Sequence, residues 1–251
     1  MQIEVYNLSK CFKNKEVLNG ISLLVEKNKI TSLIGPNGSG KTTFFRCITD
    51  IYNYQGILLY DKKDFTNNKN KIKLNLCYIA DSDDEELNLT VNEYLLLMVG
   101  LYDNKFNLEK YEILIEIYGV NPYLNEFIFN CSHGTIKKIN LILSFMVSVE
   151  LIILDEPFNG LDPEYTIITK KLINFLKNKN KTILLSCHNL SIVEEISDNI
   201  LFLNDGKLKY SGSIDEFKNL HKISTLDESW LSILGYQSNI ENAITKLSKF
   251  Y

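Results

Sequence analysis

Apolar residues in this chain gather into short continuous runs that alternate with longer segments of helical periodicity. Four of the runs predict buried β-strands, at Ile30–Ile34, Leu151–Leu154, Thr182–Leu185 and Ile200–Leu203. The last three each follow a helical segment, such as Glu164–Lys177 before the third run and Ser191–Ser197 before the fourth. Alternation of this kind is typical of a parallel sheet with helices on both faces. The chain is therefore predicted to be an α/β protein.

Two regions depart from that alternation. From Gln2 to Val25 short β-like runs dominate, with a turn signal at Leu18–Leu23, which predicts an antiparallel opening. A further strand candidate lies at Leu76–Ile79. From about Leu89 to Val149 the apolar residues recur at helical spacing with little β signal. This pattern predicts a helical subdomain inserted at about residues 82–149.

Composition narrows the functional classes. The 251 residues are 45% hydrophobic, enough for one large domain with a smaller lobe. A formal net charge of −4 argues against bare nucleic acid as the main partner. The longest apolar stretches, Tyr94–Tyr102 and Ile139–Val149, are too short to span a bilayer, and Met1–Glu4 does not open a signal peptide. Five scattered cysteines without a C-x-x-C pair indicate thiols in a reducing cytosol. We therefore expect a soluble chain.

The segment Gly35–Thr42 matches the pattern G-x-x-x-x-G-K-[ST] in full and lies between a predicted strand and a predicted helix. Such a loop turns successive backbone N–H groups toward one point, and the helix dipole adds to the attraction for phosphate. Lys41 would reach the β- and γ-phosphates of ATP, and the Thr42 hydroxyl would bind Mg²⁺. The predicted nucleotide-binding residues of the loop are Gly35, Asn37, Gly38, Ser39, Gly40, Lys41, Thr42 and Thr43.

Two acids follow the apolar run Leu151–Leu154. Ligands of parallel α/β sheets bind at the carboxyl ends of the strands, so Asp155 and Glu156 should emerge beside the phosphate loop. Asp155 suits the shell of Mg²⁺, and Glu156 is placed to activate a water for attack on the γ-phosphate. The alternative is an N-cap for the next helix. Downstream of a phosphate loop, the catalytic interpretation is favoured.

These motifs and four others, in their order, resemble the ATP-binding subunit of an ABC (ATP-binding cassette) transporter over residues 1–217. Phe12 falls where that family carries an aromatic that stacks on adenine. The run Cys131–Thr135 resembles the family signature Leu-Ser-Gly-Gly-Gln. Asp162 resembles the aspartate that crosses the dimer interface, and His188 the switch histidine that contacts the γ-phosphate.

The resemblance implies a P-loop NTPase cassette with a mixed or parallel sheet core, an N-terminal antiparallel β subdomain and an inserted helical subdomain. Two such cassettes face each other head to tail, and each ATP is closed between one phosphate loop and the other signature. Ser132, Gly134 and Thr135 would then complete the opposite site. The catalytic residues implied are Lys41, Glu156 and His188.

The chain departs from the family pattern at two places. The signature carries Cys131 and His133 in place of Leu and Gly, while the residues that touch phosphate in the family remain. The family's Gln, which senses Mg²⁺ and the membrane subunit, is replaced by Asp81. Asp81 is either a third metal ligand beside Thr42 and Asp155 or part of an exposed acidic loop with no special role. For Phe12 the alternative to stacking is a core aromatic.

The single cassette without a fused membrane domain most resembles the separate ATPase subunits of bacterial ABC-2 exporters. The resemblance implies a second subunit as partner, with a homodimer favoured, and an integral membrane permease that holds the chain at the inner face of the cell membrane. The alternatives are an importer subunit and a soluble ABC ATPase of cofactor assembly.

Residues 218–251 are predicted to be a short C-terminal extension, with helical spacing at Ile240, Ala243, Ile244 and Leu247.

Overall fold

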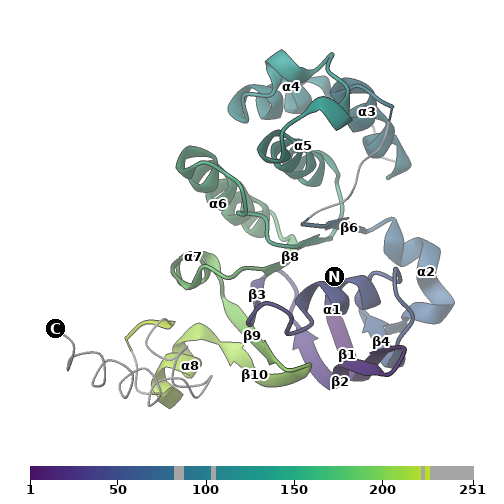
Figure 1. Ribbon diagram of the computed structural model, residues 1–251, viewed down its shortest axis with the longest axis vertical. Coiled ribbons are helices and arrows are strands. Elements are labelled where there is room, and N and C mark those ends of the chain that lie inside the picture. The colour runs from purple at the N-terminus through teal and green to yellow at the C-terminus, as the bar shows by residue number, and fades with distance from the viewer. Residues whose placement is uncertain (82–87, 103–105, 222–223, 227–251) are drawn as a thin grey trace, which may run out of the picture.

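The computed structural model describes residues 1–81, 88–102, 106–221 and 224–226. A four-stranded antiparallel sheet packs against a six-stranded mixed sheet, and a layer of helices lies beyond them at the upper end of the long axis of the molecule (Figure 1). The acidic residues after Asp81 and the predicted C-terminal helix around Ile240–Leu247 lie outside the described residues.

The first sheet has the strand order β2-β1-β4-β5. It contains β1 (Ile3–Phe12), β2 (Lys15–Val25), β4 (Gln55–Tyr60) and β5 (Lys63–Asp64), and α2 (Phe65–Lys73) follows β5. The antiparallel opening is confirmed, but the turn predicted at Leu18–Leu23 is wrong. The chain turns at residues 13–14 instead, and Gly20, with φ of +60°, lies inside β2 where the pairing with β1 shifts register. A bulge absorbs the glycine that suggested the turn.

The second sheet has the order β10-β9-β3-β8-β7-β6. Its strands are β3 (Ile30–Ile34), β6 (Leu76–Ile79), β7 (Leu151–Leu154), β8 (Thr182–Ser186), β9 (Asn199–Asn204) and β10 (Lys207–Ser213). All neighbours pair in parallel except β9 and β10. Within β7, Leu151 and Ile153 belong to one hydrophobic core, and Ile152 and Leu154 to the other. Strands covered on both faces need apolar residues at every position, which explains their continuous apolar runs.

Helices cover both faces of this sheet. The first core packs the antiparallel sheet and α1 (Lys41–Ile48) against one face. The second core packs α6 (Pro163–Asn178), α7 (Leu190–Ile196) and α8 (Ile214–His221) against the other, together with the helical layer. This arrangement confirms the predicted α/β class.

The helical layer lies between β6 and β7 in the chain. It consists of α3 (Val91–Leu101), α4 (Leu108–Ile117), the short 3₁₀ turns η1 (Asn121–Tyr123) and η2 (Ile128–Asn130), and α5 (His133–Met146). Thr90 and Glu93 form a capping box that fixes the start of α3. Of the three helices, α5 lies nearest the sheet in Figure 1, and it packs against β6.

Candidate functional site

The phosphate loop spans the six residues between the end of β3 and the start of α1. Gly38 and Gly40 have φ of +77° and +108°, values that favour glycine. A Cβ on Gly35 would lie 2.2 Å from the carbonyl oxygen of Leu203, so this position also excludes a side chain. Gly40 precedes the first turn of α1, and no side chain caps that turn. Its N–H groups are therefore available to phosphate oxygens.

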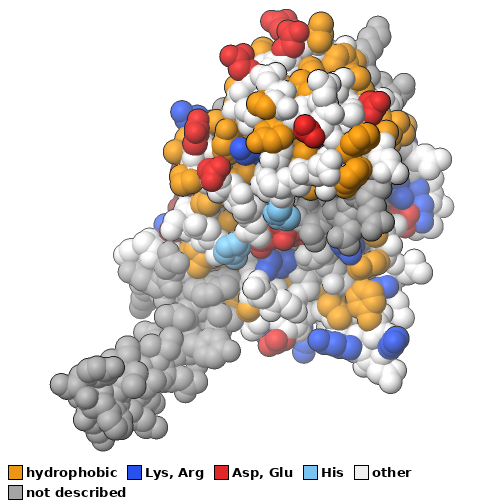
Figure 2. Space-filling model, turned by 45° about the horizontal axis from the view of Figure 1, so that its top comes forward, with side chains coloured by type: hydrophobic (Ala, Val, Ile, Leu, Met, Phe, Trp, Pro, Cys, Tyr) orange, Lys and Arg blue, Asp and Glu red, His pale blue; other side chains and the backbone are white. Residues whose placement is uncertain are grey.

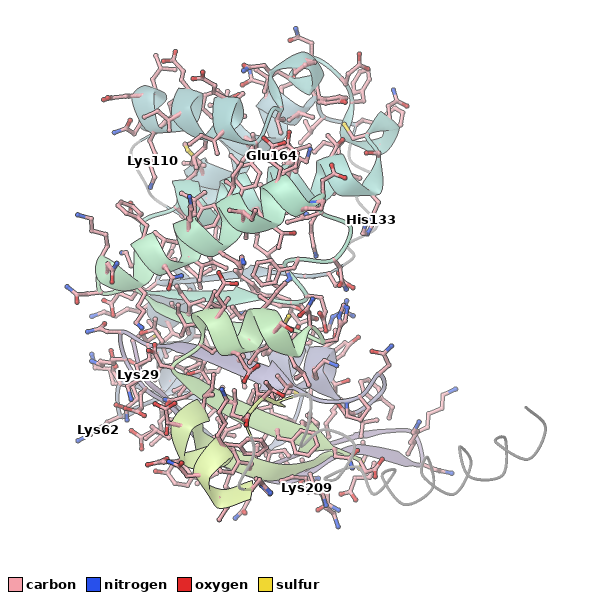
Figure 3. The ribbon with its side chains drawn as sticks, turned by 90° about the vertical axis from the view of Figure 1, so that its left-hand side faces the viewer. Lys29, Lys62, Lys110, His133, Glu164 and Lys209 are labelled. Atoms are coloured by element: carbon pink, nitrogen blue, oxygen red, sulfur yellow. The ribbon has the colours of Figure 1, made fainter. Side chains whose placement is uncertain are left out.

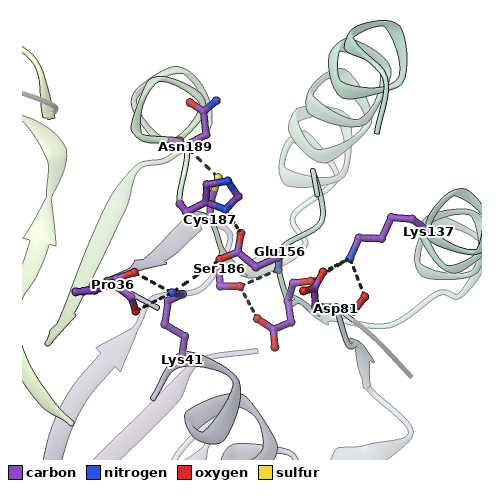
Figure 4. A network of polar contacts seen from close by, with 11 residues as sticks. Pro36, Lys41, Asp81, Lys137, Glu156, Ser186, Cys187 and Asn189 are labelled. Atoms are coloured by element: carbon purple, nitrogen blue, oxygen red, sulfur yellow. Dashed lines mark hydrogen bonds and ion pairs between the residues drawn. The ribbon is translucent and has the colours of Figure 1, made fainter. Parts of the chain in front are cut away.

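Lys41 curls back over the loop (Figure 4). Its Nζ donates hydrogen bonds to the carbonyl oxygens of Gly35 at 2.8 Å and Pro36 at 3.3 Å. The same atom lies 3.9 Å from Oε1 of Glu156, and the side chain is only 8% exposed. The ammonium is thus held above the loop, where a bound triphosphate would replace the carbonyl oxygens as its partner.

Asp155 is 1% exposed at the end of β7. Its Oδ1 accepts a hydrogen bond of 2.5 Å from the Ser186 hydroxyl, whereas Oδ2 has no partner among the described residues. A buried carboxylate oxygen without a donor is costly, and a cation satisfies it. The carboxylate chemistry of Asp155 and the hydroxyl of Thr42 therefore fit Mg²⁺.

Glu156 has φ of +46°, an unusual conformation for a residue with a side chain. Its backbone N–H donates to the Ser186 hydroxyl at 2.7 Å, and its Oε2 contacts Nδ1 of His188 at 3.0 Å. Ser186 therefore orients both acids at once. Sequence reasoning missed this residue, although its position at the end of β8, beside the end of β7, was a usable signal.

A cavity of about 610 Å³ brings most of the predicted residues together. Its lining contains Asn37, Gly38, Gly40, Lys41, Thr42, Thr43, Asp81, Glu156 and His188. Val17 and Asn159 also line it and were not predicted. The cavity thus joins the ends of β3, β6, β7 and β8 at one edge of the sheet, as parallel topology requires.

Asp81 pairs with a lysine that the sequence analysis did not single out. Its Oδ1 lies 3.0 Å from Nζ of Lys137, which projects from α5. Asp81 is therefore tied to the helical layer while it lines the cavity. The metal role predicted for it stays a prediction.

The signature residues do not line this cavity. Ser132 is the N-cap of α5 and accepts a hydrogen bond from the backbone N–H of Thr135. A Cβ on Gly134 would lie 3.1 Å from the carbonyl oxygen of Gly160, so the signature packs against the loop that leads to Asp162. Figure 3 shows His133 at the edge of the molecule opposite Lys29, which precedes β3. The signature therefore lies on the same side as the phosphate loop, at the carboxyl ends of the strands.

Phe12 ends β1 and also lies outside the cavity lining. Its side chain is 40% exposed, which rules out the alternative of a core aromatic. The ring packs edge-on against Tyr52 at 5.2 Å between centroids, and Nζ of Lys10 lies 4.8 Å from its centre. The stacking on adenine stays a prediction.

Cys187 separates Ser186 from His188 and is buried. Burial, reinforced by the negative charge of Glu156, raises the pKa of Cys187 to about 12. The thiol is therefore protonated at neutral pH and is not a nucleophile.

Within the described ranges no group of three His, Cys, Asp or Glu side chains forms a metal site. Magnesium would thus need nucleotide oxygens as ligands too.

None of the helices in the described part of the chain has the length and apolar character needed to cross a membrane.

The comparisons with a family model, with related proteins and with a solved structure agree with one another. The family model described as ABC transporter matches residues 18–159, which include the phosphate loop and both acids. The phosphonates import ATP-binding protein PhnC of Fusobacterium nucleatum is 30% identical over 85% of this chain and 94% of its own length. The lipopolysaccharide export system ATP-binding protein LptB of Haemophilus influenzae is 27% identical over 85% and 91%. A solved structure of an ATP binding subunit of an ABC transporter superposes with a TM-score of 0.84 at 26% identity, covering 93% of this chain and all of that one.

Proposed function

Because this chain belongs to the ABC transporter family as an ATP-binding subunit with ATPase activity, we propose that it powers an exporter through ATP-driven closure of two copies. Cassettes of this family bind adenine nucleotides and work in pairs with membrane permease components.

The observation that carries the catalytic proposal is the environment of Glu156. Its carboxylate lies between Lys41 and His188, and the preceding residue, Asp155, has an Oδ2 with no donor among the described residues. Mg²⁺, held by Thr42 and Asp155, would offset the charge of the phosphates when bound. Glu156 accepts the proton of the attacking water, and His188 holds that carboxylate in place. Lys41 leaves its two carbonyl partners for the phosphates and stabilises the charge that develops on them.

The position of the signature supports a homodimer. Ser132, Gly134 and Thr135 lie outside their own cavity but on the same side of the molecule. A second copy turned head to tail would bring them to the open side of the ATP site. Asp162 precedes α6 without a side-chain cap bond, and so remains available to the partner. One copy supplies every residue proposed for hydrolysis on its own side of the ATP site, namely Lys41, Asp155, Glu156 and His188.

An apolar surface on the helical layer supports a permease partner. Figure 2 shows hydrophobic side chains gathered over this layer. Those at least 42% exposed on α3 and α4 are Leu96, Leu97, Leu101, Leu108 and Ile113. A groove of about 400 Å³ between α2 and α3 adds Leu74, Met98 and Tyr102. Large exposed apolar surfaces mark interaction sites. Binding there would hold the chain at the inner face of the membrane.

Copurification tests this proposal. A tagged chain extracted from its native membranes in mild detergent should bring down an integral membrane protein. Leu101→Glu should remove that protein. Phe175→Glu should retain it, because Phe175 is also apolar and exposed but lies on α6, outside the apolar surface of α3 and α4 and the groove beside it. A chain that copurifies only with soluble proteins would favour a cofactor-assembly ATPase and contradict the transport proposal.

The direction of transport is tested with the same partner. The similarity to an import subunit makes an importer the second candidate. Inside-out vesicles that contain the partner and this chain should accumulate substrate when ATP is added outside. ATP-driven loss of substrate preloaded into those vesicles would identify an importer.

A further inference from the structure

Lys137 is a buried cation at the junction of the helical layer and the ATP site. It lies in the second turn of α5, and its side chain is only 2% exposed. A lysine is almost never buried to this degree without partners, because desolvation of an ammonium is costly. The atoms around the ammonium therefore show which groups Lys137 binds.

The ammonium of Lys137 has three acceptors, which match its three donors. Nζ lies 3.0 Å from Oδ1 of Asp81, 3.5 Å from the Asp81 carbonyl oxygen and 3.4 Å from the Asp155 carbonyl oxygen. Figure 4 shows the two contacts with Asp81 beside the Glu156 network. No metal, nucleotide or second chain is needed to explain the burial of this charge.

The two acceptor residues lie just beyond the carboxyl ends of neighbouring strands. Asp81 follows β6 and Asp155 follows β7, and these strands pair in parallel. The backbone N–H of Asp155 also donates to the carbonyl oxygen of Ile79 at 2.8 Å. The carbonyl that Lys137 holds belongs to the peptide unit leading directly into Glu156, whose φ of +46° must be maintained.

We propose that Lys137 is a positioning residue of the ATPase site. Its ammonium ties α5 to Asp81 and to the peptide between Asp155 and Glu156, and so fixes the orientation of both acids. This inference rests on the roles proposed above for Asp155 and Glu156. It also means that Asp81 acts first as the counter-charge of Lys137.

The two members of the pair differ in exposure, and this difference makes the inference testable. Asp81 has a side chain that is 39% exposed, against 2% for Lys137. Asp81→Asn leaves a buried ammonium without a counter-charge, whereas Lys137→Gln leaves a carboxylate that water can reach. Loss of one partner of a buried ion pair is far more damaging when the remaining charge is buried.

The first test measures thermal unfolding without nucleotide. Asp81→Asn should lower Tm by more than about 5 °C, and Lys137→Gln by less. Adding Lys137→Gln to Asp81→Asn should raise Tm again, because position 137 then no longer buries a charge without its partner. Such non-additivity is expected for residues that share an ion pair, whereas distant and independent sites give additive effects. If the two changes in Tm are additive, the ion pair with Asp81 does not stabilise the buried Lys137, and the inference is wrong.

The second test separates positioning from simple stability. Lys137→Gln, assayed at a temperature where it is fully folded, should lower kcat about tenfold and change KM for ATP by less than about twofold, because the phosphate loop is untouched. Lys138→Gln is the matched control, since this neighbouring lysine lies over the Tyr165 ring and away from the site. Unchanged kcat in Lys137→Gln would overturn the inference.

A failure of the inference about Lys137 can be distinguished from a failure of the proposed function. Full hydrolysis by Glu156→Gln would remove the role of Glu156, whatever Lys137 does. Inactive Glu156→Gln together with a fully active Lys137→Gln would instead refute the inference alone.

Discussion

Replacing Ser186 with Ala tests whether one hydroxyl orients both acids of the ATP site. Ser186 is fully buried; its Oγ donates to Oδ1 of Asp155 and accepts from the backbone N–H of Glu156. Ser186→Ala therefore leaves one buried acceptor and one buried donor without a partner. Each such group costs about 1–3 kcal/mol.

The structure sets the size of the effect. The two losses together give about 2–6 kcal/mol, and water entering from the adjoining cavity recovers part of it, so we expect about 2–3 kcal/mol. For a chain of this size, that lowers Tm by about 4–12 °C. Because Asp155 and Glu156 lose their shared anchor, kcat should also fall about tenfold, equivalent to about 1.4 kcal/mol in the barrier.

Ser144→Ala is the matched control for this experiment. Ser144 is equally buried, but its hydroxyl donates to the carbonyl oxygen of Leu141 within α5, where the helical hydrogen bond still satisfies that oxygen. We expect a loss below about 1 kcal/mol there. Calorimetry of the nucleotide-free proteins and steady-state ATPase assays measure both effects. Equal Tm and kcat for the two variants would refute the reasoning.

Three further predictions concern nucleotide and the second subunit. Glu156→Gln should lower ATP turnover by at least about a hundredfold with nucleotide binding intact, as measured by phosphate release and titration calorimetry; near-parent turnover would exclude it as the base. Phe12→Ala should weaken ATP binding by about 5- to 150-fold with kcat little changed, the range for loss of one stacked base, and equal affinity would exclude stacking. Glu156→Gln should shift from monomer to dimer with Mg²⁺ and ATP in sedimentation velocity, and Ser132→Trp in the same background should abolish the shift. Dimerisation only with a second, different cassette would contradict the homodimer.

Local patterns in the chain determined much of the fold. The strands Ile30–Ile34 and Leu151–Leu154 were predicted to the residue, because a strand buried on both faces needs an uninterrupted apolar run. The phosphate loop was predicted for a similar reason: its glycines, Lys41 and the flanking strand and helix all lie within a few positions of one another. Asp155 and Glu156 could be placed near that loop because parallel strands end at one edge.

Contacts between distant parts of the chain were decided only by the tertiary structure. Ser186 meets Glu156 across 30 positions, and Lys137 meets Asp81 across 56. Nothing in the residues beside Lys137 distinguishes it from Lys138, yet the packing of α5 buries one ammonium and lays the other over an aromatic ring. The glycine at position 20 likewise suggested a turn until pairing with β1 made it a bulge. A sequence specifies which groups can hydrogen-bond, but which donor meets which acceptor depends on how the layers pack.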